Sequence, residues 1–331
     1  MPLWGQQVPV PCDLLKSAQL AQSAHEASQS RKHAIAAQQF RQAYDACPSQ
    51  HELLLDLAQA LTYERSFDEA ILAAQQYLER EPQSIQGHLV LGNAYLMAVK
   101  LREAEQQAGE VLKLEPANAM ALKLRANTEY LLGDMAKAAR TLVGLLDQHP
   151  GDEDAAYMLG RVYYHDGRID HAMGAFQRVL KLNPNSHKAY DNLGLCHEAR
   201  GETEMALRHY LAAIKLVEKD HPEYDSVYTN LANLLLDQGD AEKAYGAAAK
   251  AAERNPNSAR TFYIGGKALF NLGKTDLSLN WLQRSTALDP TYPEPFYLLA
   301  RIYNQLGQKE KAAEALAAFK ELKAKGPSER R

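Results

Sequence analysis

The sequence predicts an all-α solenoid of about nine helical hairpins, and three observations support this prediction. A proline recurs at one fixed interval, with a single longer step, at positions 48, 82, 116, 150, 184, 222, 256 and 290. A glycine follows the same interval, with the same single longer step, at positions 133, 167, 201, 239, 273 and 307. Between them, apolar residues recur at the three- and four-residue spacing of amphipathic helices.

Each repeat is expected to hold two antiparallel helices. In residues 153–186 the first helix has one face of small and apolar residues: Ala156, Leu159, Gly160 and Tyr163. Gly167 then supplies the positive φ that ends a helix. The second helix ends near Pro184, because proline lacks the N–H and clashes inside a helix. Its apolar face comprises Ala172, Phe176 and Val179. The residues expected to cap second helices are Asp170, Thr203 and Thr275.

Taking the prolines as repeat ends divides the chain throughout. The predicted repeats are 17–50, 51–84, 85–118, 119–152, 153–186, 187–224, 225–258, 259–292 and 293–326. Residues 1–16 are expected to form an extended N-terminal tail, and residues 327–331 a basic C-terminal tail. The four extra residues within 214–224 favour a lengthened helix or a bulged turn, with a projecting turn that a partner contacts as the alternative.

This pattern resembles the tetratricopeptide repeat family, whose unit of about 34 residues has fixed large, small and proline positions. In 187–224 the matching residues are Tyr190, Leu193, Gly194, Gly201, Ala206, Tyr210 and Ala213. The departures from the family pattern are Arg31, Arg65, Val99, Gly265, Ser278 and Ala324. The resemblance implies a right-handed superhelix whose first helices line a concave, protein-binding face.

Composition excludes several other classes. The formal net charge of the 331 residues is −4, which argues against nucleic acid as a partner, and no apolar run is long enough for membrane insertion. The three cysteines share no CxxC spacing, so no disulfide framework is expected. Cys12 is expected to be a free exposed thiol and Cys47 a small packed residue. A cytoplasmic location is predicted, or a periplasmic one if the true start lies upstream.

No catalytic motif is found, so the chain is predicted not to be an enzyme and to use no cofactor. Gly273-Lys274-Thr275 lacks the earlier glycine of a phosphate-binding loop, and neither HExxH nor GxSxG occurs. Four residues near one turn could approach a metal, although a solvated turn is favoured and no metal site is predicted. They are His165, Asp166, Asp170 and His171.

Asparagines are expected along the middle of the groove. The positions expected to point inward are Asn93, Asn127, Asn192, Asn230 and Asn233. Asparagine amides can donate to and accept from one peptide group, so a row of them can hold an extended peptide. Asn192 and Asn230 resemble the asparagine ladder of O-linked N-acetylglucosamine transferases. The alternative is that asparagine is simply a common polar residue on these helices.

A second resemblance concerns the dicarboxylate clamp of chaperone-binding members of the family. Lys123, Asn127 and Lys188 match its positions, whereas Met158 and Asn192 replace the expected asparagine and arginine. Of the lysine and the arginine expected in the last repeat of the clamp, only Lys188 is present, which argues against a true clamp.

The C-terminal part of the groove combines cations and aromatic rings. One first helix supplies Arg260, Tyr263, Lys267 and Phe270, and the next supplies Glu294, Tyr297, Arg301 and Asn304. Arginine pairs with carboxylates and tyrosine provides large contact area, so an acidic protein or peptide segment is the predicted partner. Cation–aromatic packing within the groove wall is the alternative. The central repeat continues the pattern with Tyr157, Arg161 and Tyr164.

The predicted function is therefore an interaction scaffold that holds a peptide segment of a partner. The alternative is a structural adaptor that self-assembles through the ends of the solenoid. Leu316 and Phe319 would lie in such an interface, which would make the chain a homo-oligomer.

Overall fold

A computed structural model describes residues 12–325, and these form eighteen α-helices and no β-strand. The chain separates into two compact units, one ending at Gly167 and the other beginning at Arg168. The predicted tail at 327–331, and most of the one at 1–16, lie outside the described residues. The all-α helical-repeat prediction is confirmed.

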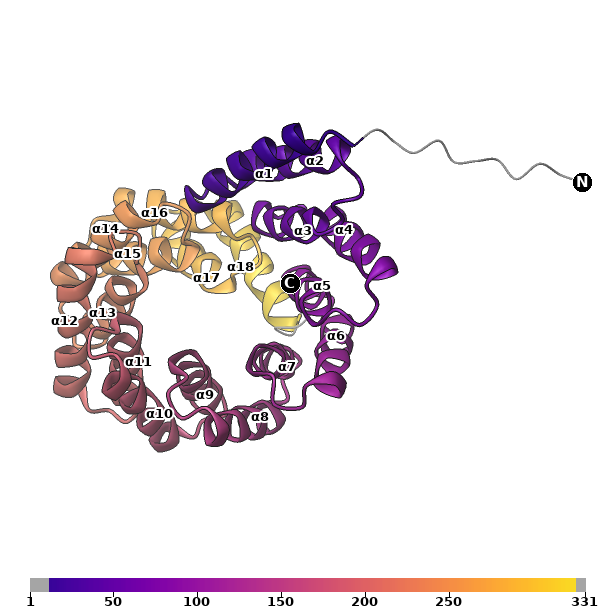
Figure 1. The fold of residues 1–331 in the computed structure, drawn as a ribbon. Helices are drawn as coiled ribbons and strands as arrows, with labels where there is room; N and C mark the ends of the chain where they lie inside the picture. The colour runs from indigo at the N-terminus through magenta and orange to yellow at the C-terminus, as the bar shows by residue number, and fades with distance from the viewer. Residues whose placement is uncertain (1–11, 326–331) are drawn as a thin grey trace, which may run out of the picture. The chain divides into compact units, whose positions relative to one another are not determined.

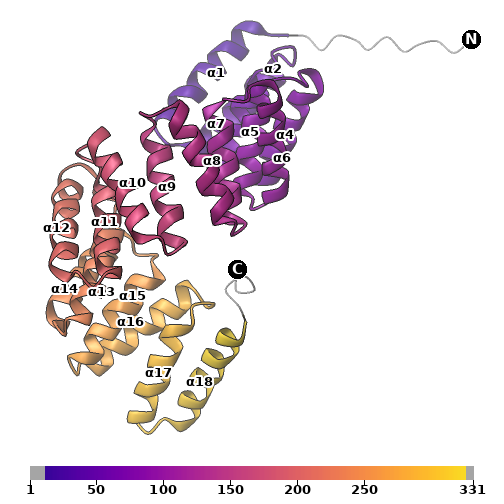
Figure 2. The ribbon, with the colours of Figure 1, turned by 90° about the horizontal axis from the view of Figure 1, so that it is seen from below.

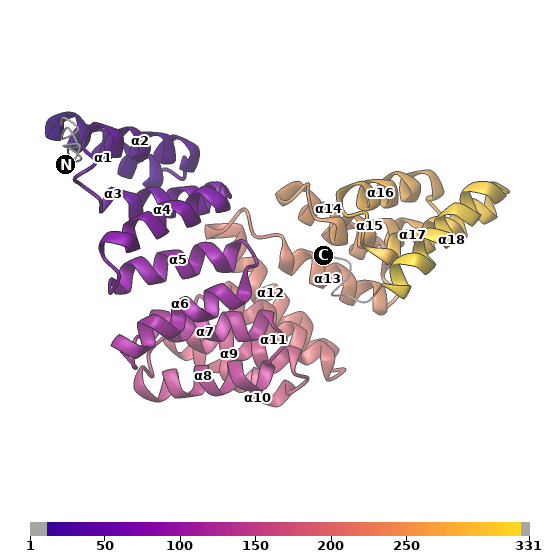
Figure 3. The same cartoon turned by 90° about the vertical axis from the view of Figure 1, so that its right-hand side faces the viewer.

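The N-terminal unit contains nine of these helices, which follow one another in chain order (Figure 3). They are α1 (Leu14–Gln29), α2 (His33–Ala46), α3 (Leu53–Glu64), α4 (Phe67–Arg80), α5 (Ile85–Met97), α6 (Leu101–Leu114), α7 (Ala119–Leu131), α8 (Met135–Gln148) and α9 (Glu153–His165).

The C-terminal unit contains the other nine, and those from α11 onwards form antiparallel pairs such as α17 and α18 (Figure 2). They are α10 (Ile169–Leu182), α11 (His187–Ala199), α12 (Thr203–Asp220), α13 (Ser226–Asp237), α14 (Ala241–Arg254), α15 (Ala259–Asn271), α16 (Thr275–Leu288), α17 (Pro293–Gln305) and α18 (Lys309–Ala324).

Within the N-terminal unit the helices form two layers. Consecutive helices pack against each other, and in addition α3 contacts α5, α5 contacts α7 and α7 contacts α9. The first helices of successive repeats therefore form one continuous layer, with α4, α6 and α8 behind them (Figure 1). In the C-terminal unit α11, α13, α15 and α17 contact one another in the same way.

Small residues allow the two helices of a hairpin to approach closely. Ala206 is fully buried, and a Cβ placed on Gly194 would lie 2.3 Å from Cε1 of Tyr210. Protein interiors are close-packed, so a small residue on one helix is matched by a large one on its neighbour.

Six turns within hairpins use a glycine with positive φ, from Gly133 to Gly307. The three repeats that lack this glycine keep the same backbone, with φ of 56° at Arg31, 74° at Arg65 and 59° at Val99. The fold therefore requires the left-handed conformation at this turn, even where the residue has a side chain that disfavours it.

The capping prediction was wrong by one or two residues. Arg168, Glu202 and Lys274 occupy the N-cap positions of α10, α12 and α16, and none of them makes a side-chain cap hydrogen bond. Asp170, Thr203 and Thr275 lie in the first turns of these helices instead. Only one residue, the N-cap, separates each positive-φ glycine from the first residue of the helix, so each helix begins earlier than predicted.

The four-residue insertion lengthens α12 to 18 residues, compared with 14 in α10 and α14. The loop that follows folds back onto α11. His221 contacts the His187 ring with centroids 4.1 Å apart, and the Tyr224 hydroxyl donates to Asp191 Oδ2 at 2.7 Å.

The N-terminal tail prediction also needs correction, because α1 begins at Leu14 and Cys12 is not a free thiol. Cys12 forms a disulfide with Cys47. The two cysteines lie at the start of α1 and just after α2, and an antiparallel hairpin brings these two ends together. Cys47 is buried as expected, whereas Cys196 is the free cysteine among the described residues.

Candidate functional site

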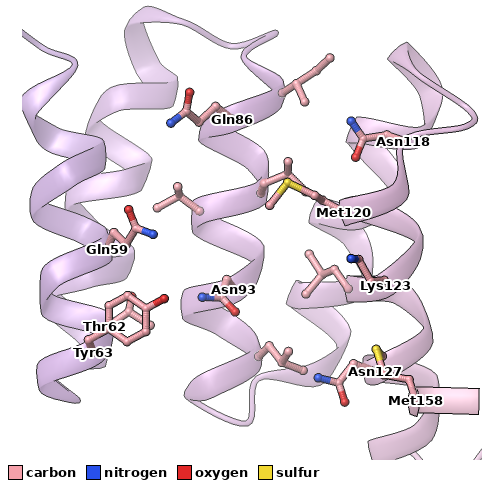
Figure 4. Close-up of a pocket in the computed structure, with 15 residues that line it drawn as sticks. Gln59, Thr62, Tyr63, Gln86, Asn93, Asn118, Met120, Lys123, Asn127 and Met158 are labelled. Atoms are coloured by element: carbon pink, nitrogen blue, oxygen red, sulfur yellow. The ribbon is translucent and has the colours of Figure 1, made fainter. Parts of the chain in front are cut away.

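A groove of about 650 Å³ lies on the first-helix layer of the N-terminal unit (Figure 4). Helices α3, α5 and α7 supply most of its walls, and α9 contributes Met158. The other lining residues are Gln59, Thr62, Tyr63, Ile85, Gln86, Leu89, Val90, Asn93, Leu96, Asn118, Met120, Lys123, Leu124 and Asn127. We call this the N-terminal groove.

Three side-chain amides form a column across the N-terminal groove. Gln59, Asn93 and Asn127 are one repeat apart from each other, so each occupies the same place on α3, α5 and α7 (Figure 4). None of the three hydrogen-bonds to another residue of the described chain, and all are at least partly exposed. We call these residues the amide column.

The spacing of this column fits an extended chain. Packed helices lie about 8–10 Å apart, and an extended peptide advances about 3.3 Å per residue. Amides on successive helices can therefore reach about every third peptide group. Because each amide both donates and accepts, it can pair with a backbone peptide group whatever side chain follows.

Apolar side chains surround the amide column. Met120 is 63% exposed and Tyr63 is 57% exposed, and both lie at the groove wall. Ile85, Leu89 and Val90 of α5 are half-buried between them. Methionine adapts to irregular partners, so the surface favours apolar side chains between the amide contacts.

The N-terminal groove carries little net charge, because its lysine is already paired. Lys123 Nζ lies 3.1 Å from Asp152 Oδ2 and 3.8 Å from Asp154 Oδ2. Burial opposes ionisation of Asp152, but the Ala155 N–H and the Lys123 ammonium together hold its pKa below the usual value. Lys123 therefore belongs to a structural ion pair as well as to the groove wall.

A smaller hollow of about 270 Å³ shares Gln59 and Tyr63 with the N-terminal groove and extends towards α1 and α2. Asp56 lies in its wall with His25 Nε2 at 3.7 Å. Burial raises the pKa of Asp56, although the nearby His25 opposes this effect.

The predicted asparagines of the C-terminal unit have different surroundings. Asn230 is only 3% exposed, and its Nδ2 donates to Asp191 Oδ1 at 2.9 Å. Asn233 Nδ2 donates to Glu198 Oε1 at 3.1 Å, and Asn192 Nδ2 donates to the Lys188 carbonyl at 2.8 Å. These amide donors bind their own helices and neighbours, whereas the amide column of the N-terminal unit does not.

Burial raises the pKa of Asp191, because the Tyr224 and Asn230 hydrogen bonds only partly offset the loss of solvent. The carboxylate joins α11, α13 and the loop after α12 into one buried contact. Asn230 therefore has a structural role in this contact, and its predicted part in peptide binding stays a prediction.

The predicted cations and rings of the C-terminal unit lie on α15 and α17. The Arg301 guanidinium lies 5.1 Å from the centre of the Phe270 ring, and the exposed Tyr297 ring contacts Phe319 at 5.2 Å. Arg260 and Asn304 are exposed, whereas Tyr263 and Lys267 are half-buried. The predicted cation–aromatic packing is thus present at Phe270.

The remaining predicted residues divide between the two units. Arg161 on α9 lies over the Tyr130 ring at 5.3 Å, within the N-terminal unit. Tyr157 and Tyr164 lie on the same helix and are half-buried, and Lys188 is exposed on α11. The sequence prediction considered asparagines and did not include Gln59. Gln59 lies one repeat before Asn93, so its position places it in the same row of amides.

Paired antiparallel helices, a continuous first-helix layer and a groove upon it define an α-helical repeat protein. Family models of the tetratricopeptide repeat match residues 22–85, 89–153, 130–194, 186–256 and 293–325, and a further TPR repeat model matches 266–307. The chain belongs to the tetratricopeptide repeat family. Proteins of this family typically act as scaffolds for protein interactions and are generally not catalysts.

Many solved structures are similar to this one, and two of them cover most of this chain. A chain of the APC/C hetero-tetramer Cut9–Hcn1 has a TM-score of 0.62 at 17% identity, and the match covers 82% of this chain and 52% of that one. This chain thus spans about half the length of that relative. A tetratricopeptide repeat protein from Parabacteroides merdae ATCC 43184 has a TM-score of 0.61 at 19% identity, covering 80% and 98%. Both show the fold alone. No curated protein matches the sequence.

None of the helices within residues 12–325 combines the length and the apolar character that crossing a bilayer requires.

Proposed function

We propose that this chain is a non-catalytic interaction scaffold that binds an extended, largely uncharged peptide segment of a partner protein in the N-terminal groove. The observation that carries the proposal is the amide column, whose three unpaired amides face an open groove with apolar walls. Because the Lys123 charge is compensated, backbone hydrogen bonds and apolar contacts would supply the binding energy.

The test is selection from a library of displayed peptides, followed by titration of the selected peptides. Gln59, Asn93 and Asn127 are replaced together by alanine. A hydrogen bond contributes about 0.5–1.5 kcal/mol, so the triple variant should bind at least about tenfold more weakly. The selected peptides should be poor in acidic residues.

A matched control removes three exposed glutamines from the opposite layer. Gln76, Gln106 and Gln148 lie on α4, α6 and α8, so replacing them by alanine should leave peptide binding unchanged. Equal affinity of wild type and the amide-column variant would refute the proposal.

A second candidate is an acidic segment bound in the C-terminal unit, as predicted from Arg260, Lys267 and Arg301. Within residues 12–325 no carboxylate forms an ion pair with these three cations, and Glu294 instead pairs with Lys323 at 2.8 Å. Acidic peptides whose binding is lost when the three cations are replaced by glutamate, but kept in the amide-column variant, would favour this site.

Self-assembly through Leu316 and Phe319 remains the alternative function. Leu316 on α18 is 36% exposed, and the Phe319 ring packs on the Tyr297 ring. Light scattering decides this alternative: a stable dimer that is lost on Leu316→Ser would support it, and a monomer of 36.8 kDa would oppose it.

A further inference from the structure

The disulfide between Cys12 and Cys47 joins the two ends of the first helical hairpin. Cys12 lies directly before Asp13, the N-cap residue of α1. Cys47 is the C-cap residue of α2. The bond therefore closes the hairpin at the edge opposite to its α1–α2 turn.

Native contacts around the bond align the two segments independently of it. The Asp13 backbone N–H donates to the Ala46 carbonyl at 2.8 Å. The buried Ser17 hydroxyl donates to the Ala43 carbonyl at 2.8 Å and lies 2.6 Å from Gln50 Oε1. Folding of the hairpin thus brings the two cysteines together.

The three cysteines differ in accessibility. Cys12 is exposed and Cys47 is fully buried. Cys196 is fully buried on α11 in the other unit, where loss of solvent raises its pKa to about 12. Thiol–disulfide exchange requires a thiolate that can reach its partner. Cys47 lies beside Cys12 in the folded hairpin, whereas Cys196 is enclosed in the other unit and does not compete for either cysteine.

We infer that the Cys12–Cys47 disulfide is a permanent structural bond of the folded protein, and that the protein therefore works in an oxidising compartment outside the cytoplasm. Glutathione and thioredoxin keep cytosolic thiols reduced, whereas structural disulfides persist in the periplasm and in secreted proteins. The inference opposes the cytoplasmic location predicted from the sequence.

Formation of the bond needs an oxidant, which would be a thiol–disulfide oxidoreductase in its disulfide form. The exposed Cys12 thiolate attacks the oxidoreductase disulfide and gives a mixed disulfide. The Cys47 thiolate then attacks Cys12 Sγ, and the oxidoreductase leaves as a dithiol after taking up two protons. Two cysteine thiols are oxidised to one disulfide while one oxidoreductase disulfide is reduced to two thiols.

The bond also supports one end of the N-terminal groove. Helix α2 packs against α3, which carries Gln59, Thr62 and Tyr63 in the groove wall. A covalent link between the ends of α1 and α2 removes conformations from the unfolded hairpin. The disulfide therefore stabilises the α1–α2 hairpin, against which α3 packs.

The first experiment counts free thiols in the protein as its source cells make it. Cells are quenched in acid, and the denatured protein is alkylated before and after reduction. We expect one alkylated cysteine, Cys196, before reduction and all three afterwards. Three alkylated cysteines before reduction would overturn the inference. So would recovery of the disulfide-bonded protein in the cytoplasmic fraction.

The second experiment measures the thermal midpoint of the wild-type protein with and without a reductant. We expect the reductant to lower the midpoint of wild type and of Cys196→Ser, which is the matched control. The reductant should leave the Cys12→Ser/Cys47→Ser double variant unchanged. An unchanged wild-type midpoint after complete reduction would show that the bond is not structural, and this comparison requires no variant to fold.

Discussion

Replacing Val99 by glycine should stabilise the protein, because Val99 adopts a backbone conformation that suits glycine. Its φ is 59°, and its N–H and that of Lys100 donate to the carbonyls of Leu96 and Tyr95 at 3.0 and 2.9 Å. This is the hydrogen-bond pattern of a Schellman motif at the end of α5. A β-branched residue is an outlier in this region of φ.

The magnitude follows from three contributions. The left-handed conformation costs an L-residue about 1–2 kcal/mol, and a β-branched residue belongs at the upper end. Glycine gains extra freedom in the unfolded chain, which opposes the benefit by about 0.4–1 kcal/mol. Val99 is 65% exposed, so the loss of its buried part costs only roughly 0.5 kcal/mol. We expect Val99→Gly to stabilise the protein by about 0.5–1 kcal/mol.

The same turn in the next repeat provides a matched control. Gly133 occupies the place equivalent to Val99 with φ of 86°, and Gly133 and Asp134 donate to Tyr130 and Glu129 as Val99 and Lys100 do to their partners. A Cβ at Gly133 would meet no atom within 4 Å, so Gly133→Val tests backbone strain alone and should destabilise.

Urea unfolding measures the global effect of both variants, and hydrogen exchange measures the local effect. The amides of Val99 and Lys100 should exchange more slowly in Val99→Gly, and those of Gly133 and Asp134 faster in Gly133→Val. A Val99→Gly protein that unfolds at lower urea than wild type would refute the reasoning. So would a Gly133→Val protein as stable as wild type.

Two further predictions concern the C-terminal unit. Gly194→Ala should destabilise the protein by about 1–3 kcal/mol, because the added Cβ would lie 2.3 Å from the Tyr210 ring. Circular dichroism at increasing urea measures this loss. The control is Gly174→Ala, where the added Cβ would meet no atom within 4 Å. Burial and the neighbouring His221 lower the pKa of His187 from 6.5 to about 4, so the unfolded chain binds more protons between these values and stability should fall as the pH drops from 6.5 to 4. His187→Asn should reduce this loss, and an equally steep loss in that variant would contradict the assignment to His187.

Local chemistry explains why the repeat was predictable from the sequence. Proline and glycine have strong backbone preferences of their own, so their shared period locates helix ends without knowledge of the tertiary structure. Val99 shows the limit of this rule, because the fold imposes positive φ on a residue that does not favour it. The tertiary contacts of the hairpin decide the backbone there.

The site was less predictable because partners on neighbouring helices decide what an amide does. Asn93 and Asn230 are the same residue type on equivalent helices, yet Asn230 is buried against Asp191 while Asn93 faces the groove. Asn93 is the ninth residue of its repeat and Asn230 the sixth, but this difference alone does not reveal the contact with Asp191, which lies on another helix. Likewise, the contact of Cys12 with Cys47 spans 35 residues and depends on the antiparallel hairpin rather than on a short motif.

Helices α15 and α16 show that residue volume is shared between two positions. Gly265 stands where the family has leucine, and a Cβ there would lie 2.2 Å from the Trp281 ring, which occupies that space from the neighbouring helix. The large side chain at this contact therefore comes from α16, and α15 carries the small residue. A comparison of single positions with the family pattern shows Gly265 as a departure, but it does not show that Trp281 on the neighbouring helix fills the space. Exchanging only one partner should therefore be harmful at a position where exchanging both is tolerated.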